Sequence, residues 1–369
     1  MHKIKILVDA HVFDDAFQGT RTVLKGLYSE LIKKDNFIFY FAARNIDNLK
    51  KEFGGSNNII YLQLKSGSKY SRLIFEIPWL IKKHNIEIAH FQYIIPLIKN
   101  CRFITTIHDV LFLDYPEYFS KLYCWKNKIL FKYASSNSDI VTTVSTYSRN
   151  SMIKHFNLTN EKVKLVPNGV EITDDITSNI KFEEFLKNHA LKDYVLFVSR
   201  FENRKNHVLL LESFLALELW KKNIKLVFIG KRIKIQKLDE LMEKLPTYVR
   251  TNILFFENIE TPLLHFIVKR ALVFIYPSIA EGFGLPPLES SLLGTRTLCS
   301  NTTALSEFDF YKEYLFNPFD VEDLSKKIEF ILHDRRFESK NKLIKLEISR
   351  RYDWRRSAEI FSHIIESCI

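Results

Sequence analysis

Two kinds of segment alternate along the chain: short apolar runs, and longer stretches in which apolar residues recur every three or four positions. In the first half, the runs rich in β-branched and aromatic residues, which predict strands, are 4–9, 37–41, 59–64, 87–91, 103–108, 140–145 and 163–166. The stretch 20–34 places its apolar residues on one face and predicts a helix. Strands that alternate with helices predict a parallel sheet covered on both faces.

The second half of the chain restarts the same pattern. Its predicted strands are 194–199, 225–230, 253–256, 271–276 and 296–299. The polar stretch 168–188 separates the halves and is predicted to be the linker. With 369 residues, two domains are the natural expectation. We therefore predict an α/β protein of two facing doubly wound, Rossmann-like domains, residues 1–172 and 173–352, with a ligand in the interdomain cleft at the carboxyl ends of the strands.

The segment that follows the predicted strand 271–276 carries the most informative chemistry. It reads Glu281-Gly282-Phe283-Gly284-Leu285-Pro286-Pro287-Leu288-Glu289. The glycines let backbone N–H groups approach a ligand, and the prolines mark the start of a helix whose N-terminus favours an anion. Because carboxylates repel phosphate, we expect Glu281 and Glu289 to accept hydrogen bonds from hydroxyls. A nucleotide sugar offers both groups. The competing interpretations are a Glu289 that complements the helix dipole and a solvated Glu281.

Arg200 and Lys205 follow the first predicted strand of the second half, where a ligand cleft is expected. Two cations at this place can neutralise a diphosphate and stabilise the charge that develops as it leaves. The alternative is a solvated basic loop, since Arg204 lies beside them.

Two residues of the first half are weaker candidates. His108 ends a predicted strand and precedes Asp109, which favours a place in the cleft, although a lone histidine is usually structural. Gly19 opens the predicted helix 20–34 and permits close backbone approach to a phosphate; a simple turn is the alternative.

The Glu281-to-Glu289 segment resembles the Glu-x7-Glu motif of glycosyltransferase family 4, a family of retaining transferases with the GT-B fold. Further segments resemble the family in the right order: 103–109 with His108-Asp109, Val144-Ser145-Thr146-Tyr147-Ser148, Val166-Pro167-Asn168-Gly169-Val170, 198–206 with Arg200 and Lys205, Asn317-Pro318-Phe319-Asp320 and Tyr352-Asp353-Trp354. The similarity covers nearly the whole chain. Two departures concern diphosphate contact: Phe17-Gln18-Gly19 has fewer glycines than the family pattern, and Ser199 replaces a usual glycine.

The resemblance implies a retaining glycosyltransferase that moves a sugar from a nucleoside-diphosphate sugar to a hydroxyl acceptor, in bacterial surface polysaccharide or lipopolysaccharide assembly. It implies that 1–172 binds a glycan or lipid-linked acceptor, that 173–352 binds the donor, and that the helix 353–369 packs back onto the first domain. It implies that Glu289 holds the ribose hydroxyls, that Arg200 and Lys205 hold the diphosphate, and that His108 contacts the donor sugar. The implied donor-binding and catalytic set is Gly19, His108, Arg200, Lys205, Glu281, Gly282, Phe283, Gly284, Leu285 and Glu289.

No metal or other cofactor is expected. The chain has no Asp-x-Asp, and Arg200 and Lys205 can supply the charge that a divalent ion would otherwise provide. The four cysteines lie in no metal-binding or disulfide spacing, which fits a reducing, cytoplasmic setting. No stretch reaches the roughly 18 apolar residues of a membrane span.

The formal charge of +11 belongs almost entirely to the first half. Residues 1–170 hold 24 Lys and Arg against 14 Asp and Glu, whereas 171–369 hold 30 against 29. Within the basic half, 118–133 carries four lysines among aromatic and aliphatic residues. Such a helix can lie on an anionic membrane, which predicts a peripheral place on the inner face; a core-packed helix with a solvated lysine edge is the alternative. Nucleic acid is not an expected partner, because no reader motif occurs.

Two rival functions remain on the same sequence. One is a sugar-nucleotide epimerase or phosphorylase with the same fold, and the other is a non-enzymatic subunit that binds a sugar nucleotide. The combination of Glu281 and Glu289 with Arg200 and Lys205 favours the transferase over both.

Overall fold

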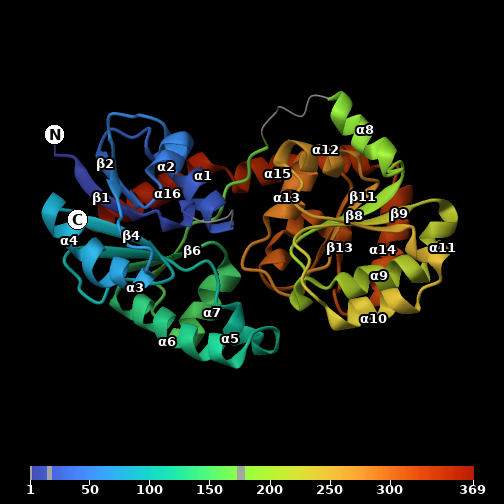
Figure 1. Ribbon diagram of the computed structural model, residues 1–369, viewed down its shortest axis with the longest axis horizontal. Coiled ribbons are helices and arrows are strands. Elements are labelled where there is room, and N and C mark those ends of the chain that lie inside the picture. Colours follow the sequence, from blue (N-terminus) through green and yellow to red (C-terminus); the bar gives the residue numbers. More distant parts are fainter. Residues whose placement is uncertain (1, 15–18, 173–178) are drawn as a thin grey trace. The chain divides into compact units, whose positions relative to one another are not determined.

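The computed structural model describes residues 2–14, 19–172 and 179–369. The chain divides into two compact units, Met1–Gly169 with Tyr352–Ile369 and Val170–Arg351, which we call the N-terminal and the C-terminal unit (Figure 1). Each unit is built on one parallel sheet, so the predicted α/β fold of two doubly wound domains is confirmed.

The N-terminal sheet has seven strands in the order β3-β2-β1-β4-β5-β6-β7. They are β1 (Ile4–Asp9), β2 (Phe37–Ala43), β3 (Ile59–Gln63), β4 (Ile88–Gln92), β5 (Arg102–Thr106), β6 (Ile140–Thr143) and β7 (Val163–Leu165). Every described pairing is parallel, for example Val8 opposite Phe41 and His90 opposite Ile104. The strand order reverses between β1 and β4, which is the point where ligands of such sheets bind.

Helices cover both faces of this sheet (Figure 1). They are α1 (Gly19–Leu31), α2 (Ile46–Phe53), α3 (Lys69–Ser71), α4 (Ile77–His84), α5 (Leu111–Asp114), α6 (Lys121–Asn137), α7 (Thr146–Phe156) and α16 (Trp354–Ser367). A π-helical turn, η2 (Arg72–Glu76), joins α3 to α4, and short 3₁₀ turns are η1 (His11–Phe13) and η3 (Pro116–Tyr118).

The last helix, α16, packs against α1 in the N-terminal unit (Figure 1). Its first residue, Trp354, lies against two glycines: a Cβ added at Gly26 would come within 2.1 Å of the indole, and one at Gly169 within 2.5 Å. Glycine is therefore required at both positions, because no real Cβ fits at such distances. The packing ties the C-terminal end of the chain to the first sheet.

The C-terminal sheet has six strands in the order β10-β9-β8-β11-β12-β13. They are β8 (Tyr194–Val198), β9 (Lys225–Ile229), β10 (Ile253–Phe256), β11 (Val273–Tyr276), β12 (Thr297–Ser300) and β13 (Leu315–Phe316). The helices of this unit are α8 (Ile180–Asn188), α9 (His207–Ala216), α10 (Gln236–Lys244), α11 (Thr247–Arg250), α12 (Thr261–Arg270), α13 (Leu285–Leu292), α14 (Val321–His333) and α15 (Phe337–Arg351), with 3₁₀ turns η4 (Asn203–Lys205), η5 (Leu219–Lys222), η6 (Thr303–Glu307) and η7 (Asp309–Tyr314).

One expectation about local structure was wrong, and one strand was missed. The stretch 168–188 is not linker throughout, since α8 occupies its last residues. Asn179 caps this helix, Leu186 is buried, and Phe182 and Phe185 contact the rings of Phe266 and Phe256. Residues 173–178 of that stretch lie outside the described residues. The two-residue strand β13 was not predicted, because so short a run has no period to detect.

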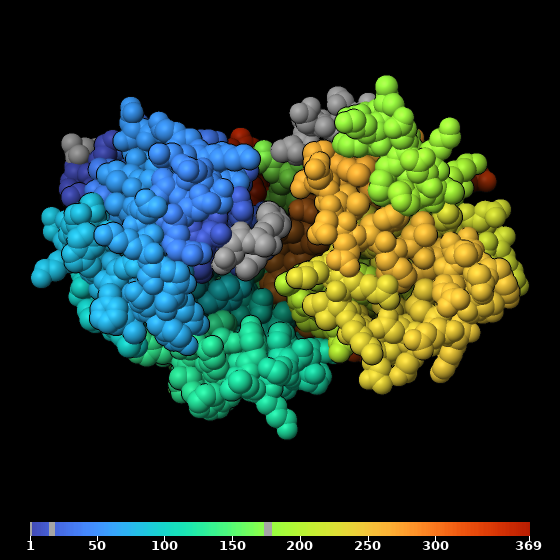
Figure 2. All heavy atoms as spheres, viewed as in Figure 1, coloured from blue at the N-terminus to red at the C-terminus, as the bar shows by residue number. Residues whose placement is uncertain are grey.

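The helix α6 exposes its apolar side chains. Leu122, Trp125 and Ile129 are each more than half exposed, and the helix lies at the surface of the N-terminal unit drawn in Figure 2. Core packing of this helix is therefore confined to its C-terminal half, where Phe131 and Ala134 are buried. Among the described residues, no helix combines the length and the apolar character that crossing a membrane requires.

Candidate active site

The loop after β8 carries Arg200 and Lys205 to the carboxyl end of the second sheet. Gly230, at the end of the neighbouring β9, has φ +149° and lies against this loop: a Cβ there would come within 1.9 Å of the Ser199 carbonyl oxygen. The turn η4 ends at Lys205 and is capped by Asn206, which has a left-handed φ of 62°. The side-chain amide of Asn206 donates a hydrogen bond to the Pro318 carbonyl oxygen (2.7 Å), and the chain continues into α9. This turn directs Lys205 inward, where its side chain is buried.

The loop after β11 brings Glu281 to the same edge of the sheet. Its backbone N–H donates to the Thr303 hydroxyl (2.9 Å), and its carboxylate is buried. Gly284 has φ +108° and precedes α13; a Cβ there would collide with Leu305 at 2.3 Å. Phe283 packs inward against Phe308, and Pro286 and Pro287 fill the first turn of α13. Because prolines have no N–H, the donors at this helix start come from Leu285 and the residues before it.

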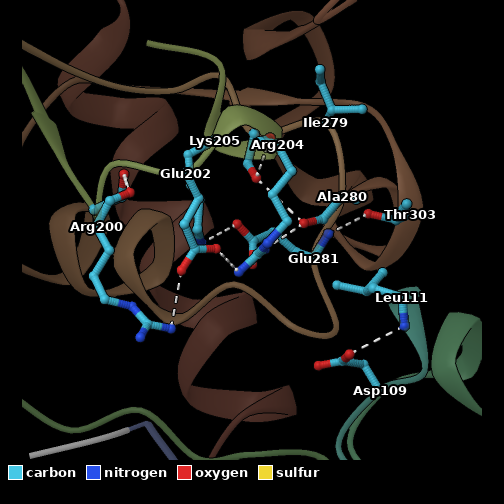
Figure 3. Close-up of polar contacts among 12 residues, drawn as sticks. Asp109, Leu111, Arg200, Glu202, Arg204, Lys205, Ile279, Ala280, Glu281 and Thr303 are labelled. Atoms are coloured by element: carbon cyan, nitrogen blue, oxygen red, sulfur yellow. Dashed lines mark hydrogen bonds and ion pairs between the residues drawn. The ribbon is translucent and has the colours of Figure 1, made fainter. Parts of the chain in front are cut away.

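Charged side chains of the two loops form one network (Figure 3). The Lys205 Nζ donates to Glu281 Oε1 (2.5 Å) and to the Tyr276 hydroxyl (3.0 Å), and that hydroxyl also donates to Glu281 Oε1 (3.0 Å). Arg204 donates through Nη1 to Glu281 Oε2 (3.2 Å) and to the Ala280 carbonyl oxygen (2.7 Å). The result is a continuous network of charged and hydroxyl groups beyond the ends of β8 and β11.

Burial and charge act in opposite directions on Glu281. Burial acts to raise the pKa of Glu281, but Lys205 and Arg204 outweigh it and lower that pKa to about 2. Burial lowers the pKa of Lys205, and Glu281 opposes this. Glu281 is therefore ionised at neutral pH, and its contact with Lys205 Nζ is a buried ion pair.

Glu289 lies on α13 in a different environment. Its side chain is partly buried, and no described residue forms an ion pair with it. Burial raises the pKa of Glu289 to about 7. The two acids of one motif are thus tuned apart: Glu281 is held ionised by cations, and Glu289 is poised near neutral pH.

In the N-terminal unit, His108 lies just after β5 within a buried polar network. Its Nε2 bonds to Gln92 Oε1 (2.9 Å), and the amide nitrogen of Gln92 lies 3.2 Å from His90 Nε2. His90 also bonds to the Tyr28 hydroxyl (2.7 Å). Burial lowers the pKa of His108 to about 4, so its imidazole is neutral at pH 7. The following residue, Asp109, accepts from the Leu111 N–H (3.2 Å) (Figure 3).

Comparisons with known proteins agree with this geometry. The sequence model described as "Glycosyl transferases group 1" matches residues 179–348, and that described as "Glycosyltransferase Family 4" matches residues 17–174. The chain belongs to glycosyltransferase family 4. The resemblance drawn from its motifs is thereby confirmed, and with it the GT-B fold.

Relatives of this glycosyltransferase include bacterial mannosyltransferases. It is 27% identical to the "O-antigen chain mannosyltransferase B" of Escherichia coli over 84% of this chain and 87% of that protein. It is 24% identical to the "Serotype-specific mannosyltransferase WbdA" of Escherichia coli over 62% of this chain; the chain spans only 29% of that relative's length. Among solved structures, Anabaena HepE in complex with UDP-glucose has a TM-score of 0.72, 14% identity, and coverage of 99% of this chain and 100% of that one.

The structure brings part of the predicted set of this glycosyltransferase together. Lys205 and Glu281 are in direct contact, and Arg200 lies on the same loop as Lys205 but points its guanidinium outward, where Glu202 Oε1 is 3.2 Å away. His108 belongs to the other unit. Gly19 is the exposed first residue of α1, and nothing lies within 4 Å of a Cβ built there, so packing does not require a glycine at that position.

Several residues of this glycosyltransferase's network escaped sequence reasoning. The sequence offers Arg204 only as part of a solvated basic loop, whereas its side chain is 13% exposed and donates to Glu281. Glu202, Tyr276 and Thr303 were not considered, nor was Gln92 beside His108. The alternation Arg-x-Glu-x-Arg-Lys in 200–205 was the one available signal, because three cations so close in sequence need an acid to balance them.

Proposed function

We propose that this protein is a retaining glycosyltransferase that moves a hexosyl group from a nucleoside-diphosphate sugar to a hydroxyl of a glycan or lipid-linked acceptor. The observation that carries this proposal is the network of Arg200, Lys205 and Glu281, with Glu289 on α13, the helix that follows the Glu281 loop. It offers cations for a diphosphate and carboxylates for hydroxyls at the carboxyl edge of one sheet.

Each chemical group of the donor is proposed to have its own binding residues. Glu289 accepts hydrogen bonds from the ribose hydroxyls, and Glu281 with the backbone of 283–285 contacts the sugar. Arg200 and Lys205 hold the diphosphate, and their charges are worth most as it departs. Gly19 contributes backbone contact to the diphosphate, and His108 contacts the sugar.

The proposed reaction keeps the anomeric configuration. The bond between the anomeric carbon and the diphosphate oxygen breaks, and a bond to the acceptor oxygen forms on the same face. The departing diphosphate oxygen takes the acceptor proton, so no protein base is needed. The low pKa of His108, about 4, supports this assignment, because so weak a base is poorly matched to proton abstraction at pH 7.

The relatives support the substrate class. Two are named as O-antigen or serotype-specific mannosyltransferases, and a structural neighbour was solved with UDP-glucose. We therefore propose a mannosyl or other hexosyl donor and a role in bacterial surface polysaccharide or lipopolysaccharide assembly. The proposed setting is the cytoplasm.

Product analysis tests the proposal most directly. With GDP-mannose and UDP-glucose as donors and a panel of glycan and lipid-linked acceptors, proton NMR of the product should show the donor's own α configuration. A β-linked product would overturn the retaining assignment. Conversion of the donor without acceptor would favour the epimerase or phosphorylase rival, and donor binding without any turnover would favour the non-enzymatic rival.

Metal independence is tested in the same assay. Within the parts of the chain that the structure describes, no three His, Cys, Asp or Glu side chains lie close enough to hold a metal ion. We propose that the cations of the 200–205 loop replace one, so turnover should persist in excess EDTA. Loss of turnover with EDTA and recovery with manganese or magnesium would refute this part.

A second proposal concerns location. We propose that the N-terminal unit attaches to an anionic membrane through an aromatic–lysine surface made of Tyr70, Phe75, Trp79, Lys82, Lys83, Leu122, Trp125, Lys126 and Ile129. The apolar members are exposed, and α6 carries four lysines and no acid. Burial lowers the pKa of Lys69, and Lys126 is close enough to lower it further. This proximity places α6 and the segment before α4 on one side of the unit. Exposed aromatic residues flanked by lysines fit a lipid surface rich in phosphate.

A further inference from the structure

Five charges at the carboxyl end of β8 and β11 form an alternating chain (Figure 3). Arg200 Nη2 lies 3.2 Å from Glu202 Oε1, and Glu202 Oε2 lies 2.7 Å from Arg204 Nη2. Arg204 Nη1 lies 3.2 Å from Glu281 Oε2, and Lys205 Nζ completes the chain on Glu281 Oε1. Every carboxylate oxygen of the two acids faces a cation.

The chain runs from the interior to the solvent. Lys205, Glu281 and Arg204 form its buried end, Glu202 is about a quarter exposed (26%), and the Arg200 side chain is 67% exposed. The buried end alone holds two cations and one acid, an excess of one positive charge. Leaving a charge unbalanced in a buried site is costly, so a counter-ion is required. Within the described residues, Glu202 fills that place and also binds the outermost cation.

We propose that Glu202 is an internal counter-ion that stands in for the donor's diphosphate while the site is empty, and that yields Arg200 to the diphosphate when donor binds. This inference rests on the proposed function, because it takes Arg200 and Lys205 as the diphosphate site. A guanidinium binds a carboxylate and a phosphate with the same paired geometry, so the two anions compete for Arg200. Arg204 keeps its bonds to Glu281 and to the Ala280 carbonyl oxygen, and therefore remains the fixed anchor of the network.

The exchange affects both ends of the catalytic cycle. Glu202 opposes diphosphate binding by competing for Arg200 and by like-charge repulsion. The product is a nucleoside diphosphate and carries the same two phosphates, so return of Glu202 to Arg200 favours product release. Glu202 forms no covalent bond and moves no proton in this scheme. It is a positioning residue whose effect is exerted through Arg200.

Calorimetric binding of UDP and GDP, compared with uridine and guanosine, tests the exchange. Glu202→Gln keeps the size of the side chain but removes its charge, and it should tighten nucleoside diphosphate binding by about fivefold, the upper range for a partly exposed charge pair. Binding of the uncharged nucleosides should not change. Glu202→Asp keeps the charge and should stay near the wild-type affinity. Glu183→Gln, which removes the partner of the exposed Arg270 at 3.1 Å in the same unit, is the matched control and should have no effect.

A double variant isolates the proposed route. In an Arg200→Gln background, Glu202→Gln should lose most of its tightening effect, because the residue it releases is gone. Unchanged or weaker diphosphate binding by a folded Glu202→Gln protein, or equal tightening with and without Arg200, would overturn the inference. If neither UDP nor GDP binds the wild-type protein more tightly than its nucleoside, the proposed donor site fails instead.

Discussion

The two sheets have the same strand order near their centres, but the side chains that follow their strands differ in charge. At the C-terminal edge, Glu281 is ionised and bound by two buried cations. In the N-terminal sheet, His108 and His90 are buried, neutral and linked through Gln92, and Asp9 at the end of β1 forms an ion pair with the buried Arg72 (3.5 Å). One topology therefore carries an acid bound by two cations in one sheet and, in the other, an ion pair beside a chain of neutral histidines. The difference lies in the side chains that follow each strand.

The largest expected effect lies in the charged edge. Lys205→Ala and Arg200→Ala should each lower turnover by about 10²–10³-fold, as expected for loss of one preorganised charge that stabilises the leaving group. Lys205→Ala also removes one of the two cations that bind Glu281, so thermal unfolding should be followed beside kcat. Lys237→Ala, which breaks the exposed pair with Glu212 at 2.9 Å, is the control for loss of a lysine in this unit. Turnover within threefold of wild type in both site variants would exclude the charged edge as the leaving-group site.

The buried histidines of the N-terminal sheet should make the stability of the protein sensitive to acid. Because the folded pKa of His108 is about 4 against 6.5 in an ordinary environment, the unfolded chain binds a proton before the folded chain does. This residue's contribution is intact above pH 6.5 and is lost as pH falls towards 4, by up to about 3 kcal/mol. Chemical denaturation of wild type and His108→Gln between pH 7.5 and 4.5 measures the difference. Parallel curves would mean that His108 is not a buried neutral histidine.

Glu289, on α13, differs from both sets of residues because its carboxyl group changes charge near neutral pH. With a pKa of about 7 it is largely protonated at pH 6 and ionised at pH 8, and the ionised form accepts hydroxyl hydrogen bonds more strongly. Nucleoside diphosphate affinity should therefore rise across that range. Glu289→Gln should weaken binding by about 1.5–3 kcal/mol and flatten the rise.

The terminal phosphate of the ligand titrates over part of the same range, so the informative quantity is the difference between the wild-type and Glu289→Gln slopes. A 2′,3′-dideoxynucleoside diphosphate provides a second control, since it lacks the hydroxyls that Glu289 is proposed to bind. Equal slopes with both ligands and both proteins would remove Glu289 from the ribose site.

The smallest effect concerns the outer surface of the N-terminal unit. Replacing Lys126 by Gln should weaken binding to anionic vesicles by about fivefold, since one lysine near such a surface contributes about 1 kcal/mol. Trp125→Ser should weaken binding through lost apolar contact. Sedimentation with phosphatidylglycerol and phosphatidylcholine vesicles at two salt concentrations is the measurement, with Lys326→Gln in the C-terminal unit as control. Equal partition into both vesicle types would leave the charge without a membrane role.

Much of the fold follows from local pattern. The alternation of apolar runs and helical stretches predicted both parallel sheets, because strands buried on two faces read as continuous apolar runs. It missed α8, which follows directly on a stretch rich in Asp, Asn, Ser and Thr, and β13, whose two residues are too few to show a period. The acidic motif and the Arg200–Lys205 loop were also visible in the sequence, because they lie on short contiguous segments.

The amino-acid order alone identifies the class of fold, the family and the residue types that follow β8 and β11. How those residues pair depends on the folded chain. Arg204 and Glu281 are 77 positions apart, and Gln92 and His108 are 16 apart, one ending β4 and the other just beyond the neighbouring β5. Which cation faces which acid, and which imidazole stays neutral, depends on burial and on distances of a few ångströms. Those quantities arise only when parallel strands bring their carboxyl ends together.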